Sequence, residues 1–214
     1  MNDDGQRTEA LHTLLERRDL TDPAQGEHPM QELVTRLCNA QDGRRHRSLR
    51  TPPLVSAGQG WRVRHATTET VLAALPDLLA EEQAGLLVSC AGVVCGNRQQ
   101  YATVLVAHQL DCWILGERAS TVLSGAVGGA MAAALPGVPY RLLPQRGSRV
   151  GPGFRVDVLA GSQWQEVGLC GVLEAEGTVA AGFSLVLEPL LAVAPWVDHA
   201  PTDGMTQTVT SSRS

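Results

Sequence analysis

The sequence contains no lysine, and all 17 of its basic residues are arginine. Schiff-base enzymes, P-loop nucleoside triphosphatases and enzymes that use lysine as an acid or base are therefore excluded. Aromatic residues are also scarce, at 4% of 214 residues, so a core must be built from leucine, valine and alanine. The formal net charge of −5 argues against a protein that wraps DNA or another phosphate backbone.

The five cysteines are odd in number and include no C-x-x-C pair. This pattern supports neither a disulfide framework nor a zinc knuckle, and it favours buried free thiols in a reducing compartment. The first residues are acidic and lack the basic-then-apolar order of a signal peptide. The most apolar window, residues 122–135, is shorter than the ~20 apolar residues that cross a bilayer. We therefore predict a cytoplasmic chain without a membrane segment.

Composition divides the chain into an N-terminal arm with a short helix (1–22), a core domain (23–198) and a disordered tail (199–214). Apolar residues at helical spacing predict one helix that Thr8 caps and that ends before Asp22, and further helices over 29–38, 67–79 and 120–135. β-rich runs predict strands over 86–95, 102–115 with a break near Asp111, 139–143, 154–159, 163–168 and 178–187. Several of these strands follow one another without a crossover helix, which favours an α+β fold with an antiparallel sheet flanked by helices.

The arginine-rich segment 42–50 has two interpretations. It is either a solvated basic segment near a loop or a contact for an anionic partner.

Short motifs then occur in order along the chain: His108-Gln109-Leu110-Asp111, Arg155-Val156-Asp157-Val158, Trp164-Gln165-Glu166-Val167 with Cys170-Gly171, and Gly182-Phe183-Ser184-Leu185-Val186-Leu187-Glu188. Upstream, Arg64-His65-Ala66-Thr67-Thr68 is similar to an Arg-Thr-His-Thr-Ser segment. Over about residues 19–197 this set resembles the catalytic core of the phenylalanyl-tRNA synthetase α chain, a class II aminoacyl-tRNA synthetase. The resemblance implies the class II fold, ATP with magnesium, and a homodimer built through the helix over 29–38.

In that family the glutamine of His-Gln-x-Glu and the glutamate after it bind the ligand's ammonium group, which corresponds here to Gln109 and Asp111. Strand alternation places these two side chains on one face, where amide and carboxylate acceptors suit an ammonium group. From the residues alone, the wet side of an ordinary half-buried strand explains the pair equally well. The resemblance extends the amino-acid site to Thr67, His108, Cys170, Gly171, Gly182, Phe183 and Ser184.

The resemblance also associates Glu166 and Glu188 with the nucleotide and its magnesium. Purely structural roles explain several of these residues as well. Glu166 fits a surface strand, Gly182 and Ser184 fit close strand packing, and His108 fits a structural histidine.

Two departures fall on the phosphate-binding arginines of the family. The arginine that would hold the ATP α-phosphate is Gly96 here, and the arginine of the third motif is Pro189. Arg98 lies two residues beyond Gly96, so on a continuing strand it faces the same side and could take over the catalytic role. Loss of both cations would remove the charge stabilisation that adenylation requires.

We therefore predict a class II core that binds an amino acid, aromatic or otherwise apolar, and whose ATP-dependent adenylation is weakened or lost. The alternative is an active amino-acid ligase that uses Arg98 and transfers the amino acid to tRNA or to another acceptor. The acidic charge, and the reduction of the family's N-terminal coiled coil to one short predicted helix, argue against tRNA binding. Neither zinc, NAD nor a pyridoxal phosphate Schiff base is expected.

Overall fold

The computed structural model of the chain describes residues 18–41, 43–52, 54–57, 60–81, 85–98, 103–116, 119–145, 153–175 and 178–197. The predicted disordered tail and most of the predicted helix that follows Thr8 lie outside these residues, and residues 18–21, at the end of that prediction, are not helical.

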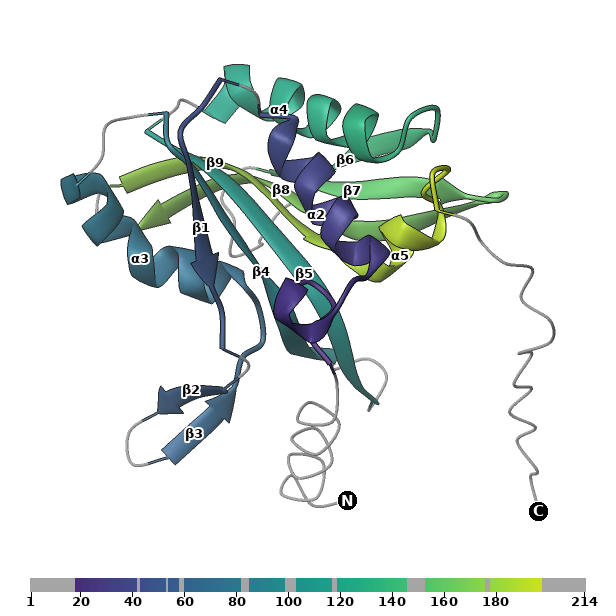
Figure 1. The fold of residues 1–214 in the computed structure, drawn as a ribbon. Coiled ribbons are helices and arrows are strands. Elements are labelled where there is room, and N and C mark those ends of the chain that lie inside the picture. Colours follow the sequence, from purple (N-terminus) through teal and green to yellow (C-terminus); the bar gives the residue numbers. More distant parts are fainter. Residues whose placement is uncertain are drawn as a thin grey trace, which may run out of the picture.

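The described residues form one large mixed sheet and one small hairpin (Figure 1). The large sheet has seven strands in the order β1-β4-β5-β9-β8-β7-β6, and the hairpin consists of β2 and β3. The strands are β1 (His46–Arg50), β2 (Leu54–Ala57), β3 (Gly60–Val63), β4 (Leu87–Arg98), β5 (Thr103–Leu115), β6 (Tyr140–Gln145), β7 (Gly153–Ala160), β8 (Gln163–Ala175) and β9 (Thr178–Val186). The helices are η1 (Pro23–Gln25), α2 (Pro29–Asn39), α3 (Thr68–Glu81), α4 (Ala119–Ala134) and α5 (Leu187–Ala192).

The predicted α+β class is confirmed, with one difference in strand direction. All neighbouring strands of the large sheet are antiparallel except β1 and β4, which are parallel. Strand β1 is the second half of the arginine-rich segment and forms an edge of the sheet, directly after the turn at residues 43–45. Its exposed side chains, including His46 and Arg47, fit the predicted solvated character.

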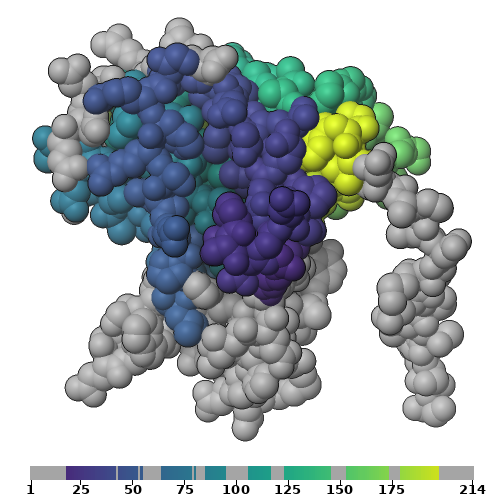
Figure 2. Space-filling model, in the orientation of Figure 1, coloured from purple at the N-terminus to yellow at the C-terminus, as the bar shows by residue number. Residues whose placement is uncertain are grey.

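Two hydrophobic cores lie on the two faces of the sheet. Helices α2, α4 and α5 pack on the face that carries Leu110, Cys112 and Phe183, which we call the covered face. Helix α3 packs on the opposite face against Cys90 and Trp113, which we call the α3 face. Figure 1 shows this division, and the space-filling view shows α2 and α5 side by side at the surface (Figure 2).

Local signals explain where α2 begins. His28 is extended and its Nδ1 accepts a hydrogen bond from the Met30 N–H at 3.1 Å, while Pro29 occupies the first helical position. Met30, Leu33 and Leu37 then lie at helical spacing and are all buried. The predicted helix over 29–38 is confirmed, as are the predicted helices that correspond to α3 and α4.

Two predicted strand interruptions are wrong. Strand β5 continues through Asp111, which pairs with Cys90 on one side and Ser184 on the other. Strand β8 continues past Gly168, where the pairing with β7 shifts register. A Cβ on Gly168, whose φ is +155°, would lie 2.1 Å from the Ser184 carbonyl oxygen, so glycine here allows a close passage of two strands instead of ending one.

Among the described residues, no helix combines the length and the apolar character needed to cross a membrane.

Candidate functional site

The carboxyl group of Asp111 is fully buried on the α3 face of β5, at the N-terminus of α3. Its Oδ1 accepts hydrogen bonds from the Thr68 hydroxyl and the Trp113 indole N–H, both at 2.7 Å. Its Oδ2 accepts from the Thr67 hydroxyl and from the Ser184 hydroxyl at 3.2 Å. Four donors therefore occupy the lone-pair positions of one carboxylate.

Gln109 extends this network toward solvent. Its Oε1 accepts a hydrogen bond from the Thr67 backbone N–H at 3.2 Å, and its Nε2 donates to the Ser184 hydroxyl. Gln109 is half-buried, whereas Thr67 is fully buried and Ser184 is 7% exposed. The prediction that Gln109 and Asp111 share a strand face is confirmed, because both side chains bond Ser184. We call Thr67, Thr68, Gln109, Asp111, Trp113 and Ser184 the Asp111 cluster.

Two opposing effects act on the Asp111 carboxyl. Burial raises its pKa, while the hydrogen bonds from Thr67, Thr68, Trp113 and Ser184 act to lower it. The net direction is upward. The positive end of the α3 helix dipole lies beside the carboxylate and favours its charged form.

When Asp111 is ionised, it fixes the direction of the hydroxyl groups around it. The Thr67, Thr68 and Ser184 hydroxyls each direct a hydrogen toward the carboxylate. Each hydroxyl then has only oxygen lone pairs left for another partner. The half-buried members of the cluster, Thr68 and Gln109, therefore offer acceptor lone pairs above a buried negative charge, and Gln109 Nε2 carries one further N–H besides the one it donates to Ser184.

His108 lies on the opposite face from this cluster and makes a separate network. Its backbone N–H donates to Glu188 at 2.9 and 3.1 Å, and its Nδ1 lies 2.8 Å from Glu188 Oε1. Its Nε2 accepts a hydrogen bond from the Leu20 N–H at 3.0 Å and lies 3.3 Å from the Arg18 carbonyl oxygen. Burial alone would raise the pKa of Glu188, but the hydrogen bonds from His108 outweigh it and hold that pKa below its ordinary value.

The structure thus separates the predicted amino-acid-binding residues into two groups. Thr67, Gln109, Asp111, Gly171, Gly182 and Ser184 belong to the α3 face, by contact or by ladder register. His108, Cys170 and Phe183 belong to the covered face, where Cys170 and Phe183 are buried against the helices. Alternation along the strand is the cause, since neighbouring residues of one strand point to opposite faces.

Gly182 makes the close contact that its lack of a side chain permits. A Cβ at this position would lie 2.0 Å from the Cys112 carbonyl oxygen and 2.8 Å from the Trp113 Cα. Gly171 pairs with Gly182 across β8 and β9. The two glycines therefore allow close strand packing beside the Asp111 cluster.

Glu166 lies in a second polar group near the edge of the sheet. Asp157 is 1% exposed and accepts hydrogen bonds from Arg141 at 2.9 Å and from Arg155 at 2.8 Å. Glu166 is half exposed and 4.0 Å from the Arg155 guanidinium. The Arg141 guanidinium also stacks over the Trp164 ring, 4.5 Å from its centroid.

The predicted magnesium-associated glutamates do not fit one ion. The Glu188 carboxylate is occupied by His108 on the covered face, whereas Glu166 pairs with Asp157 on the opposite face. Among the described residues, no three histidine, cysteine or acidic side chains come together as metal ligands. The positions of Glu166 and Glu188 therefore give no support to a shared magnesium site.

The positions that the resemblance assigns to phosphate binding lie near the end of β4 and near the start of α5. Gly96 and Arg98 belong to the last part of β4, opposite Leu105 and Thr103. The backbone of β4 continues through Arg98, but the Arg98 side chain lies outside the described part of the structure. Pro189 is the third residue of α5 and lies in its first turn. Backbone N–H groups in the first turn have no partner within the helix, so proline loses no helical hydrogen bond there.

Sequence reasoning missed the part that Trp113 plays. Its position two residues after Asp111 places it on the same strand face, which is the signal that could have identified it. The indole is fully buried and contributes an N–H that can only donate, so it specifically requires an acceptor such as Asp111.

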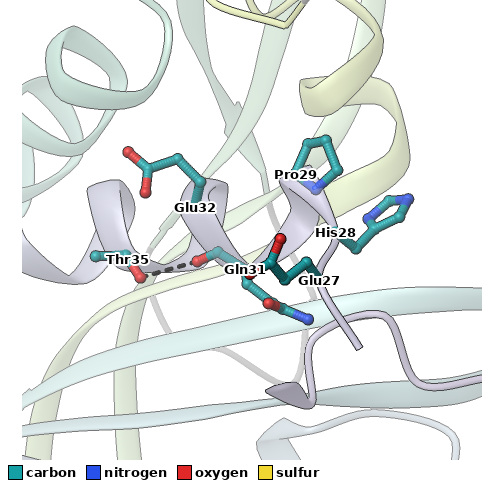
Figure 3. A pocket seen from close by; sticks show the side chains of 6 residues that line it. All are labelled: Glu27, His28, Pro29, Gln31, Glu32 and Thr35. Carbon is teal, nitrogen blue, oxygen red and sulfur yellow. Dashed lines mark hydrogen bonds between the residues drawn. The ribbon is translucent and has the colours of Figure 1, made fainter. Parts of the chain in front are cut away.

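An open surface hollow lies elsewhere, beside the start of α2 (Figure 3). Its lining residues all come from this one segment: Glu27, His28, Pro29, Gln31, Glu32 and Thr35. It shares no residue with the Asp111 cluster, and its side chains do not converge on a point (Figure 3).

Comparison with known proteins identifies the fold. No protein-family model matches the chain, and no curated protein matches it in sequence. Among solved structures, the chain is similar to pyrrolysyl-tRNA synthetase from Desulfitobacterium hafniense, with a TM-score of 0.58 and 16% sequence identity. The alignment covers 86% of this chain and 75% of that chain. The fold is therefore that of a class II aminoacyl-tRNA synthetase catalytic core, as predicted, and the phenylalanyl subtype remains a prediction.

Proposed function

We propose that this chain binds a free amino acid on the α3 face, with the ligand's ammonium group at the Asp111 cluster. The observation that carries the proposal is the fixed direction of the hydroxyl groups around Asp111. An ammonium group offers three donors and no acceptor, so it complements lone pairs above a buried carboxylate. The Gln109 Oε1 and the Thr68 hydroxyl, both half-buried, are the acceptors nearest to solvent.

The surroundings of the cluster favour an apolar ligand side chain. Gly171 and Gly182 are buried and carry no side chain, and the half-buried Leu169 lies next to Ser184 in the ladder. The surroundings of the cluster on β8 and β9 are therefore backbone and aliphatic. This supports the predicted aromatic or other apolar amino acid as the ligand class.

We further propose that adenylation is weak or lost. The phenylalanyl-type resemblance places Gly96 and Pro189 where the family has its two phosphate-binding arginines. Removal of one preorganised charge-stabilising donor costs about 3–4 kcal/mol, or roughly two to three decades in rate. Two independent losses would lower the rate by about four to six decades.

One observation favours the alternative, an active ligase. Strand β4 continues without a break through Arg98, so positions 96 and 98 have the same parity in one strand. In that case Arg98 supplies the catalytic cation for an amino acid–AMP forming reaction, with ATP as co-substrate.

Calorimetry with a panel of free amino acids, and separately with ATP, tests the binding proposal. We expect an apolar amino acid to bind and its N-acetyl derivative to show no heat, because acetylation removes the ammonium group. Gln109→Met should abolish binding, while the matched Gln163→Met, at an exposed site that starts β8, should leave it unchanged. Equal binding of the amino acid and its N-acetyl derivative would contradict the proposal.

Pyrophosphate exchange then distinguishes a chain that only binds an amino acid from an active amino-acid ligase. We expect no exchange above background in the wild-type chain with the amino acid that binds. Exchange that Arg98→Ala abolishes would support the alternative.

The homodimer, the cytoplasmic location and the lack of tRNA binding also remain proposals. The dimer rests on the resemblance, which assigns the interface to α2, and the α2 residues Glu32 and Thr35 are exposed beside the hollow (Figure 3). Sedimentation equilibrium of the purified chain tests the dimer, and salt-dependent filter binding tests tRNA.

A further inference from the structure

Two cysteines far apart in sequence are in contact beneath the covered face. Cys38 lies in the last turn of α2 and Cys112 lies in β5, and their Sγ atoms are 3.6 Å apart. Both side chains are buried, with 6% and 1% exposure. A disulfide has an S–S distance of about 2.05 Å, so the two sulfurs need to approach by only about 1.5 Å.

The surroundings of Cys38 distinguish it from an ordinary buried thiol. His46 of β1 is exposed, and its Nε2 lies 2.7 Å from the Ser89 hydroxyl. Ser89 pairs directly with Cys112 in the β4–β5 ladder. A solvent-accessible imidazole and a buried hydroxyl therefore lie beside the sulfur pair.

These neighbours assign different roles to the two sulfurs. The hydrogen bond with Cys112 lowers the pKa of the Cys38 thiol, and together with hydrogen bonds to His46 and Ser89 it outweighs burial, which acts to raise that pKa. Burial raises the pKa of Cys112, and its partnership with Cys38 raises it further. Cys38 is thus the nucleophile and Cys112 the thiol that resolves it.

The other buried thiols of the described residues have no such surroundings. Burial raises the pKa of Cys90 to about 12 and that of Cys170 to about 11. Neither has a second sulfur within hydrogen-bonding distance in the described residues, so they serve as internal controls.

We propose that Cys38 and Cys112 are an oxidative modification site that forms a reversible intramolecular disulfide in the presence of a peroxide. The Cys38 thiolate attacks one oxygen of hydrogen peroxide, the O–O bond breaks, and hydroxide leaves, which produces a sulfenic acid on Cys38. The Cys112 sulfur then attacks the Cys38 sulfur, the S–O bond breaks, and water leaves with the Cys112 proton. Two thiols are oxidised by two electrons in total, and one peroxide is reduced to two waters.

The position of the pair links the modification to the centre of the sheet. Cys112 lies between Asp111 and Trp113, which belong to the Asp111 cluster. The disulfide would therefore fasten α2 to the strand that carries the proposed ligand site. The thiol chemistry itself does not depend on the proposed function.

The test uses the reduced, purified wild-type chain with hydrogen peroxide at neutral pH. We expect two of the five thiols to disappear, with a mass decrease of about 2 Da that dithiothreitol reverses. Trypsin cleaves here only after arginine, so Cys38 lies in peptide 37–44 and Cys112 in peptide 99–118, each as its only cysteine. The two peptides should be linked when the digest is not reduced.

Variants assign the order of events. Cys112→Ser should stop the reaction at a Cys38 sulfenic acid, which dimedone captures, whereas the matched Cys170→Ser should still lose two thiols. Recovery of all five thiols, or of unlinked 37–44 and 99–118 peptides from the oxidised wild-type chain, would overturn the proposal. Because that mapping uses the wild-type chain, it decides the matter even if a variant fails to fold.

Discussion

Gly182 offers a sharp test of how tightly the sheet is packed beneath the proposed site. In Gly182→Ala, the new Cβ would lie 2.0 Å from the Cys112 carbonyl oxygen, whereas real Cβ atoms essentially never come closer than 3.0 Å. Both nearest atoms belong to the backbone of β5, so no side chain can rotate away. Strands β5 and β9 must therefore separate locally by about 1 Å or more.

The cost of this separation follows from two contributions. Overpacking of a close contact costs about 1–3 kcal/mol. Stretching the backbone hydrogen bonds beside the Cys112–Phe183 and Trp113–Gly182 pairs costs about 1 kcal/mol for each bond that is lost. We expect Gly182→Ala to destabilise the protein by about 3 kcal/mol or more, a large part of the ~5–15 kcal/mol stability of a typical domain.

Gly125→Ala is the matched control. Gly125 is exposed in α4, and an added Cβ there meets nothing within 4 Å, so the same substitution should stabilise the helix by about 0.5–1 kcal/mol. Urea unfolding followed by circular dichroism measures both variants. At a slope of about 2 kcal/mol/M, the two midpoints should differ by roughly 2 M. Equal midpoints would refute the reasoning.

Two pH-dependent predictions concern the carboxyl groups of Glu188 and Asp111. The Glu188 pKa is lowered in the folded state, so this carboxylate stabilises the protein above its unfolded value of 4.5, and the contribution is lost as the pH falls through the folded pKa. Glu188→Gln should therefore cost about 1 kcal/mol at pH 7 and nothing in acid, and urea midpoints across pH measure the difference. Asp111 behaves in the opposite sense, because burial raises its pKa above 3.8. Protonated Asp111 donates to a neighbouring hydroxyl, so calorimetry should show amino-acid binding weakening at a pH above 3.8; unchanged affinity down to that pH would contradict the role of its charge.

Much of the fold follows from local periodicity. The apolar stripe of Met30, Leu33 and Leu37 predicts α2, and the β-rich runs predict the strands from β4 onward. Strand β1 escaped prediction because its side chains are exposed at a sheet edge and show no alternation of apolar and polar residues. Its parallel pairing with β4 is a contact between distant segments, which no local pattern encodes.

The candidate site also combines features that local sequence patterns predict with contacts between distant segments that they do not. The alternation of Gln109 and Asp111 on one face is local, and the structure confirms it. Alternation also implies that His108 faces the other way, although the family motif groups it with them. The contribution of Thr67 and Thr68 from the start of α3 depends on how the helix docks onto the sheet, which the sequence does not show.

The proposed ammonium site and the proposed ATP site differ in how much they contribute to the stability of the fold. Asp111 joins α3, β5 and β9 through four hydrogen bonds, and its loss would leave the buried Trp113 N–H without an acceptor. The positions that the resemblance assigns to phosphate binding are less central to the fold, since Gly96 lies near the end of β4 and Pro189 lies in a helical turn that needs no backbone N–H. Arginine at either position is therefore dispensable for folding, whereas Asp111 is not. We therefore expect a class II core to lose ATP binding more readily than the proposed ammonium site, because only the residues of the proposed ammonium site also hold the fold together.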